Sequence, residues 1–285
     1  MATERDRMGS VMTLAGASLV VLAAGSGSRF GGLKQLAPVD ADGATITDIN
    51  VRRAAAAGFE RAVLVIAPGM EAQVRDHLGR DGGALPVPVE LAVQQSVPGR
   101  SRPLGTAAAV LAARAAVDGS FVVVNADDVY PPSAFALAAD HLRTSADAEH
   151  ALVAFRLVRT LYGDRPVSRA VLEADVAQAL VAIREGTITY GTSGLEFEAA
   201  GVVEPVVPDA FVSMNMWGFR PSIFEPLAAA VAQFVASDRS GEVWLPDVVQ
   251  AEVSAGVIVR VLVCEARCFG VTHPEDIAAV RGTLL

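Results

Sequence analysis

The sequence has few cysteines and few histidines, which limits the chemistry that its side chains can support. It contains two cysteines, Cys264 and Cys268, whereas a structural zinc site needs four ligands. We therefore interpret both as apolar residues of a cytoplasmic protein. None of the four histidines has a neighbour at a spacing that suggests a catalytic dyad, so each is expected to be solvated or packed.

Positive charge and long apolar runs are also scarce. The formal net charge is -9 and the isoelectric point is near 5.0, which argues against a nucleic acid or an anionic membrane as partner. No run of about 18 uninterrupted apolar residues is present, so no transmembrane helix is expected. A small anionic substrate is compatible with this balance, because local clusters of cations can still bind phosphate.

A secretory signal is not expected at the N-terminus, although an apolar run follows two arginines there. Glu4 and Asp6 offset those arginines, and cleavage near Ala23 would remove the start of a glycine-rich loop. We therefore expect residues 1–17 to be an N-terminal extension and the protein to be cytoplasmic.

The order of apolar runs predicts an α/β fold. Runs rich in valine, isoleucine and phenylalanine alternate with alanine-rich segments, which is typical of βαβ units and a mostly parallel sheet flanked by helices. The expected strands are residues 19–23, 62–67, 87–94, 121–124 and 257–263, and the expected helices are residues 47–57, 104–117, 221–235 and 245–255, with a short helix ending near His77 and a last helix after Thr272.

Between residues 151 and 218 this alternation stops, which predicts a mixed β region that carries the second substrate. Turns are expected at Gly163-Asp164, at Glu185-Gly186 and at residues 191–194.

The chain shows no boundary between independent domains, because it has no repeat, low-complexity linker or long charge run. We expect one domain over residues 18–285, with a nucleotide-binding half at 18–150 and an acceptor-binding half at 151–285.

The most informative stretch is residues 19–34, where an apolar strand runs directly into a loop with four glycines and two cations, Arg29 and Lys34. Backbone N–H groups at the carboxyl end of a buried parallel strand are where open α/β sheets bind phosphates. The loop lacks the two commoner glycine signatures. Phe30 replaces the last glycine of a dinucleotide fingerprint, and Lys34 comes one place too late for a Walker loop. The stretch is therefore predicted to hold a polyphosphate by another pattern.

A second anchor follows the strand at 121–124, in the order Asn125-Ala126-Asp127-Asp128. The carboxyl ends of neighbouring parallel strands meet at one edge of the sheet, so both carboxylates are expected beside the glycine-rich loop. Mg²⁺ prefers carboxylate and phosphate oxygens, so an aspartate here suits a metal that bridges to a nucleotide phosphate. Asp128 could instead bind a metal-bound water, and capping the helix near Pro131 is the alternative role for either aspartate.

In the order Leu-Ala-Ala-Gly-x-Gly-Ser-Arg-x-Gly-Gly-x-Lys-Gln, the loop resembles the signature of the sugar-phosphate nucleotidyltransferases, which join an NTP to a phosphorylated small molecule. The resemblance extends along residues 18–285. Motifs at 212–219, 243–249 and 269–277 look like a bacterial branch that is often labelled glucose-1-phosphate uridylyltransferase-like. The resemblance implies a Rossmann-like fold of the GT-A type, an Mg²⁺-dependent nucleotidyltransferase and a place in nucleotide-sugar biosynthesis.

The resemblance also assigns roles to single residues. It implies that Arg29 stabilises the departing pyrophosphate, that Lys34 stabilises the α-phosphate region and that Asp127 binds Mg²⁺. Nucleotide contacts are implied for Leu22, Ala24, Gly25, Gly27, Gln94, Gly105 and Thr106, and contacts with sugar hydroxyls for Glu185 and Asn215.

Two positions depart from the family pattern. The lysine that usually follows the glutamate is Gly186 here, so an exposed turn residue is the alternative for Glu185. The second metal-binding aspartate of many members is Gly270. Asp276 lies close in sequence and could substitute for it, or it could be an ordinary carboxylate in the first turn of a helix.

The favoured function is condensation of an NTP, with UTP preferred, and a sugar 1-phosphate to an NDP-sugar and pyrophosphate. The attacking phosphate is already anionic, so no general base is required and catalysis consists of alignment and charge neutralisation.

Three alternatives stay open: a cytidylyltransferase acting on an alcohol phosphate, a GT-A glycosyltransferase and a non-catalytic nucleotide sensor. The cations of the loop argue against the glycosyltransferase, because its nucleotide-sugar donor carries no triphosphate. The missing aspartate at position 270 is what favours a sensor. The expected partners are thus an NTP and a phosphorylated small molecule, with the oligomeric state left open.

Overall fold

The computed structural model describes residues 16–25, 36–39, 43–79, 85–97, 99–100, 103–145, 148–192, 194–237, 240–271 and 276–277. The predicted N-terminal extension and the predicted last helix lie mostly outside these residues, and the division into halves stays a prediction.

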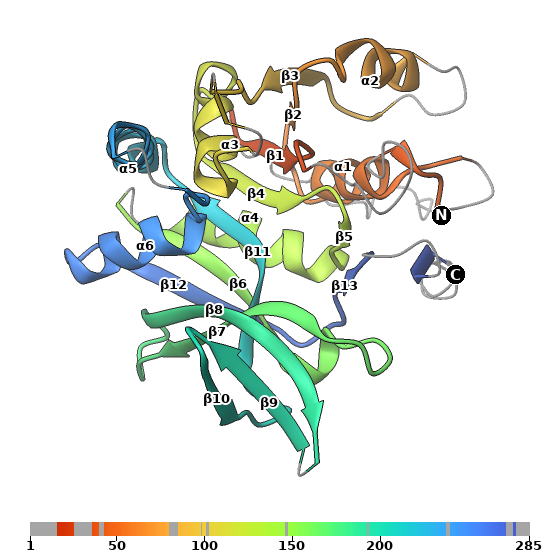
Figure 1. Ribbon diagram of the computed structural model, residues 1–285. Coiled ribbons are helices and arrows are strands. Elements are labelled where there is room, and N and C mark those ends of the chain that lie inside the picture. Colours follow the sequence, from red (N-terminus) through yellow and green to blue (C-terminus); the bar gives the residue numbers. More distant parts are fainter. Residues whose placement is uncertain are drawn as a thin grey trace.

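The described residues form strands and helices that alternate through the first half of the chain (Figure 1). The strands are β1 (Ser18–Leu22), β2 (Arg61–Ile66), β3 (Val89–Val93), β4 (Phe121–Asn125), β5 (Asp128–Val129), β6 (His150–Arg156), β7 (Val167–Ala174), β8 (Leu180–Gly191), β9 (Gly194–Ala199), β10 (Val202–Pro205), β11 (Phe211–Phe219), β12 (Val259–Cys264) and β13 (Phe269–Gly270). The helices are α1 (Ile46–Ala56), α2 (Glu71–Leu78), α3 (Thr106–Ala112), α4 (Pro132–Thr144), α5 (Phe224–Ala236) and α6 (Leu245–Ser254), with 3-10 turns η3 (Arg114–Ala116), η4 (Leu157–Arg159) and η5 (Pro221–Ile223).

The core of the main sheet is parallel. β1 lies between β2 and β4 and is parallel to both, and β3 extends the row beyond β2. Leu19, Val20 and Val21 of β1 are fully buried, because helices cover both faces of the sheet. The predicted mostly parallel sheet with flanking helices is thereby confirmed for this part of the chain.

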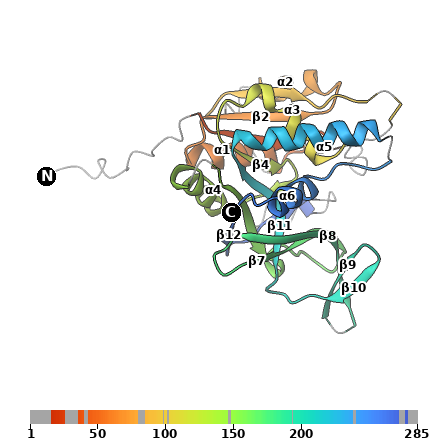
Figure 2. The same cartoon turned by 90° about the vertical axis from the view of Figure 1, so that its left-hand side faces the viewer.

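The second half of the chain adds antiparallel strands, which confirms the predicted mixed β region. β11 runs antiparallel to β4 on one side and to β6 and β7 on the other. From β7 the sheet continues through β8, β9 and β10, which project below the helical layers in Figure 2. β12 lies parallel to β6.

Two helical layers bury opposite faces of this sheet. Alternate residues of a strand point to opposite faces, so Leu19 and Val21 pack with α1 and α4, whereas Val20 packs with α3, α5 and α6. Figure 2 shows α5 and α6 on the side of the sheet that faces the viewer. No helix in the described part combines the length and the hydropathy that a bilayer span requires.

Two local predictions need correction. The turn expected at Glu185-Gly186 is wrong, because both residues lie inside the continuous strand β8. A Cβ atom on Gly186 would lie 2.4 Å from the Phe197 ring, so this glycine permits close packing of β9 and does not mark a turn. The helix expected at 104–117 is shorter, since α3 ends at Ala112 and η3 follows it. The predicted turn at 191–194 is confirmed as the β8–β9 hairpin.

Candidate active site

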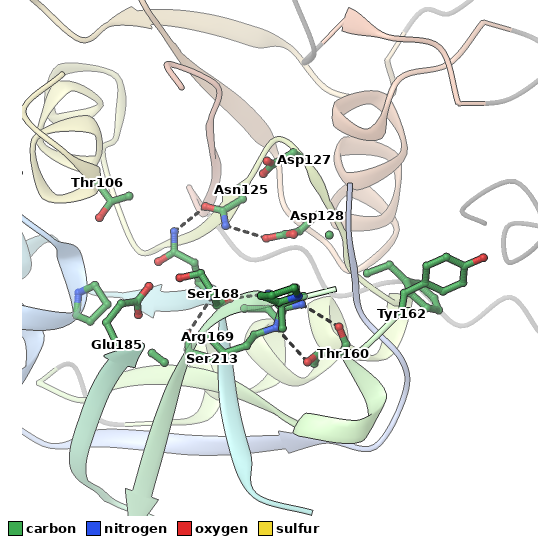
Figure 3. Close-up of a pocket in the computed structure, with 18 of the residues that line it drawn as sticks. Thr106, Asn125, Asp127, Asp128, Thr160, Tyr162, Ser168, Arg169, Glu185 and Ser213 are labelled. Carbon is green, nitrogen blue, oxygen red and sulfur yellow. Dashed lines mark hydrogen bonds between the residues drawn. The ribbon is translucent and has the colours of Figure 1, made fainter. Parts of the chain in front are cut away.

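A cleft of about 400 Å³ opens at the carboxyl end of β4 (Figure 3). Asn125, the last residue of β4, is paired with Leu22, the last residue of β1. The N–H of Ala126 then donates to the carbonyl of Leu22 over 3.1 Å. The strand that leads to the glycine-rich loop and the strand that leads to the acidic pair therefore end side by side, as predicted.

The cleft brings together several residues for which the sequence predicts a role, and others for which it does not. The predicted residues that line it are Thr106, Asp127, Asp128, Glu185, Asn215 and Asp276, and the additional residues include Asn125, Thr160, Arg165, Arg169 and Trp244. Leu22, Ala24, Gly25, Gln94 and Gly105 are described but are not among its lining residues, and Gly27, Arg29 and Lys34 lie outside the described residues.

The two aspartates after β4 have different surroundings. Asp127 lines the cleft, and its carbonyl accepts the N–H of Val271 over 2.8 Å. Asp128 is buried in β5, where its Oδ2 accepts a hydrogen bond of 2.7 Å from the amide of Asn125. The capping role is wrong for both, because α4 begins after Pro131 without a side-chain cap hydrogen bond.

A chain of hydrogen bonds connects Asp128 to β11. The Trp217 indole donates to Asn215 Oδ1, the Asn215 amide donates to Asn125 Oδ1, and the Asn125 amide donates to Asp128, each over 2.7 Å. Asn125 is therefore a site residue to which the sequence analysis gave no role, although its place beside the acidic pair was a usable signal.

The backbone at Asn215 is unusual for a strand. Its φ is 58°, in the left-handed region that residues other than glycine rarely adopt, and the pairing of β11 with β6 shifts between Ser213 and Trp217. The N–H of Asn215 donates to Ser213 Oγ over 2.9 Å. This bulge turns the Asn215 side chain into the cleft. Bulges often change the direction of a side chain in this way beside an active site.

Position 270, where the aspartate is absent, lies directly against Asp128. Gly270 of β13 is paired with Asp128 of β5, and a Cβ atom on Gly270 would lie 2.7 Å from Asp128 Oδ1. The carboxylate of Asp128 therefore occupies the space that a side chain at 270 would need.

Asp276 forms an ion pair with Arg165, which enters the cleft from the loop before β7. Within the described residues, no group of three histidine, cysteine or acidic side chains is arranged to hold a metal ion. Mg²⁺ that arrives with a nucleotide needs only one or two protein carboxylates, because phosphates and water complete its shell. Asp127 fits that smaller requirement.

Arg169 of β7 lies half-buried at the cleft, with its guanidinium bonded to oxygen atoms of uncharged groups. It donates to Thr160 Oγ1 over 3.1 Å, to the Thr160 carbonyl over 2.8 Å and to the Ser168 carbonyl over 2.6 Å. Burial lowers the pKa of Arg169, and the Asp128 carboxylate is the main group that opposes this shift.

Glu185 lies in the middle of β8 at the cleft, so the turn of the alternative interpretation is wrong, whereas the exposure that it predicted is confirmed. Solvent reaches it through the cleft, yet surrounding protein and the nearby Asp247 carboxylate raise the pKa of Glu185. The position after it has no room for a lysine, because Phe197 covers Gly186.

The residues expected to read the base bond to one another and to the first residue of α6. Gln94 is buried, and its amide donates to the Gly105 carbonyl over 3.1 Å. Thr106 Oγ1 accepts the N–H of Leu245 over 2.9 Å. Their contacts with a nucleotide stay a prediction.

Several solved structures have a fold similar to that of this chain. It is similar to solved structures of the inositol-1-phosphate CTP transferase from T. maritima (TM-score 0.65, 17% identity, 93% of each chain covered) and of UDP-glucose pyrophosphorylase complexed with UDP-glucose (TM-score 0.62, 15% identity, 94% of this chain and 98% of that chain). It is also similar to HddC from Yersinia pseudotuberculosis (TM-score 0.59, 14% identity, 94% and 99% covered). A search of curated proteins gave no match.

The sequence itself identifies the family. The model of the MobA-like NTP transferase domain matches residues 19–189, which is more than half of the 285 residues. The matched segment contains most of β1, the glycine-rich loop, the acidic pair and most of β8. The chain therefore belongs to the family of MobA-like NTP transferase domains.

Proposed function

We propose that this protein transfers the nucleoside monophosphate group of an NTP, preferably UTP, to a sugar 1-phosphate, giving an NDP-sugar and pyrophosphate. The observation that carries the proposal is the composition of the cleft, where carboxylates at the end of β4 share one space with Arg165 and Arg169. Such a space offers groups for a metal-bound triphosphate and for a second phosphorylated molecule.

The reaction needs no proton transfer. A phosphate oxygen of the acceptor forms a bond to the α-phosphorus of the NTP. The bond from that phosphorus to the oxygen that bridges to the β-phosphorus breaks, and pyrophosphate leaves with the electron pair. The protein's task is therefore to align two anions and to neutralise their charge.

Asp127 is the residue that we propose for Mg²⁺, together with the triphosphate oxygens. When bound, the ion supplies positive charge that orients the triphosphate. Asp276 is the less suitable ligand, because Arg165 already neutralises its carboxylate. Asn125 and Asn215 position Asp128 beside Asp127, and Glu185 accepts hydrogen bonds from acceptor hydroxyls.

A pyrophosphate-release assay tests the proposal. Each of the four common NTPs is combined with Mg²⁺ and a panel of hexose 1-phosphates, inositol 1-phosphate and other alcohol phosphates. Release with UTP and a hexose 1-phosphate is expected. Release only with CTP and an alcohol phosphate would contradict the preferred substrates and favour a cytidylyltransferase, and NTP binding without release would favour a nucleotide sensor.

Substitution of the loop cations tests the catalytic part. Arg29→Ala and Lys34→Ala are each expected to lower kcat by about 100-fold or more, as when a preorganised transition-state donor is removed. Arg184→Ala is a suitable control, because Arg184 of β8 is exposed and pairs with Glu204 of β10, away from the cleft. Near-normal turnover in both loop variants would contradict the mechanism.

A further inference from the structure

We propose that Arg169 holds the phosphate group of the acceptor, an assignment that rests on the proposed function. The residue lines the cleft from β7, in the half of the chain opposite to the glycine-rich loop. Figure 3 shows it beside Thr160 and Ser168, away from Asp127.

The hydrogen bonds of Arg169 leave part of the guanidinium available. Arginine carries five N–H donors, and three of them bind oxygen atoms of Thr160 and Ser168. One N–H on each terminal nitrogen has no acceptor in the described part of the chain. Two terminal N–H groups are the arrangement with which arginine binds phosphate through paired hydrogen bonds.

The charge of Arg169 is also without a directly bonded counterion. Its three acceptors are uncharged, and no carboxylate of the described residues accepts a hydrogen bond from it. Asp128 and Glu185 are close enough to influence its pKa but do not bond to it. The half-buried guanidinium therefore presents positive charge at the cleft without a bonded carboxylate, which favours the arrival of an anion.

The three bonds to Thr160 and Ser168 also fix the guanidinium before any ligand arrives. Thr160 follows η4 and is itself buried, and its hydroxyl donates to the Leu157 carbonyl over 2.9 Å. A fixed guanidinium loses little conformational freedom on binding, which is the benefit of preorganisation.

The acceptor phosphate is the anion that this position suits. The triphosphate is expected at the carboxyl ends of β1 and β4, which the glycine-rich loop and Asp127 follow in the sequence. Arg169 comes from the antiparallel half and lies near Glu185, the residue expected to contact acceptor hydroxyls. The neighbouring strand cannot supply this cation, because Gly186, paired with Arg169, has no room for a side chain.

The experiment compares Arg169→Gln with the wild-type chain, using inorganic phosphate in calorimetry and the acceptor found by the pyrophosphate assay in kinetics. Loss of the guanidinium should weaken phosphate binding and raise the KM for the acceptor by roughly 100-fold, whereas the KM for the NTP should stay unchanged. Arg169→Lys should recover part of the loss. Arg184→Gln is the matched control, because Arg184 lies on the adjacent strand but pairs with Glu204 and does not line the cleft.

If Arg169→Gln fails to fold, NMR of the wild-type chain with ¹⁵N-labelled arginine gives the answer. The Nε–H resonance of Arg169 is identified as the one that is missing from the spectrum of Arg169→Lys. Inorganic phosphate should shift this resonance, and a shift confined to other arginines would overturn the assignment. An unchanged acceptor KM in folded Arg169→Gln would do the same while leaving the proposed function intact. Phosphate binding through Arg169 without pyrophosphate release from any substrate pair would instead refute the proposed function.

Discussion

The side chains around the acidic pair each have one possible orientation. The indole of Trp217 can only donate a hydrogen bond, so the oxygen of the Asn215 amide must face it. The ionised carboxylate of Asp128 can only accept, so the nitrogen of the Asn125 amide must face that carboxylate. Trp217 and Asp128, at the two ends of this row of hydrogen bonds, thus fix the orientation of both amide groups. Asp128 is therefore held in place before any substrate binds.

A second buried residue, His150, makes the stability depend on pH. Its Nδ1 accepts the N–H of Arg220 over 3.1 Å and its ring packs edge-on against Phe219. Burial, with smaller contributions from the charges of Arg220 and His141, lowers the pKa of His150 from 6.5 to about 4. The folded protein therefore keeps this histidine neutral in a range where the unfolded chain protonates it.

We expect this histidine to reduce stability as the pH falls from 6.5 to about 4. Above that range it is neutral in both states, so its full contribution is present. Within the range the unfolded chain gains a proton that the folded chain does not, which costs about 3 kcal/mol in total. Urea unfolding of wild type and His150→Gln at several pH values measures this effect. The free energy of unfolding of the variant should change less steeply with pH than that of the wild type. Equal slopes would contradict the prediction.

At the level of elements, the start of α3 depends on the close approach of the segment that leads into α6. The N–H of Val243 donates to the Leu104 carbonyl over 2.7 Å, and the N–H of Ala107 donates back to Val243 over 3.1 Å. Between them Gly105 has a φ of 100°, and a Cβ atom on it would lie 2.6 Å from the Val243 carbonyl oxygen. Only glycine fits this crossing.

Gly105→Ala should therefore lower the free energy of unfolding by about 3 kcal/mol or more, from backbone strain and from the steric clash. Gly69→Ala is the matched control, because Gly69 has a φ of 87° but nothing within 4 Å of its added Cβ atom. That variant should lose only about 1–2 kcal/mol. Urea unfolding compares the two, and equal losses would show that the crossing is not as tight as the distances indicate.

Elements of the parallel core could be predicted from the sequence because they are covered on both faces. β1 and β4 appear as unbroken apolar runs followed by glycine or polar residues, so their positions and their shared edge followed from the pattern. The two-residue strands β5 and β13 could not be predicted, because such short strands have no periodic signal.

The location of a site residue was predictable where it follows from a place at a strand end, as for Asp127, which lines the cleft. Arg169 was not predicted to line the cleft, because its position there depends on Thr160 and on the register with β8, which local sequence does not reveal. The burial of Gln94 could not be predicted either, because it depends on the hydrogen bond of its amide to the Gly105 carbonyl, which local sequence does not reveal.

At the scale of the whole molecule, the cleft has walls from both halves of the chain. Thr106 and Asp127 come from the first half, whereas Arg169, Glu185 and Trp244 come from the second. Any ligand that fills the cleft must therefore contact segments that are far apart in sequence.

The two tryptophans of the chain report on such a ligand. Trp217 is fully buried, whereas Trp244 is 41% exposed and lines the cleft. Acrylamide is expected to quench the emission of Trp244 selectively, and MgUTP with glucose 1-phosphate should reduce this quenching. Trp244→Phe should remove both the quenching and the protection, and strong quenching that persists in this variant would contradict the assignment.

The position of β11 has a consequence for how the protein can be produced. This strand from the second half covers the edge of the valine-rich strand β4 (Figure 1). A fragment of residues 18–150 alone would leave that edge unpaired, and an exposed apolar strand edge is a template for aggregation. Residues 18–150 are thus unsuited to expression as a minimal fragment, and ligand screens or crystallisation trials require a chain that reaches at least through β11.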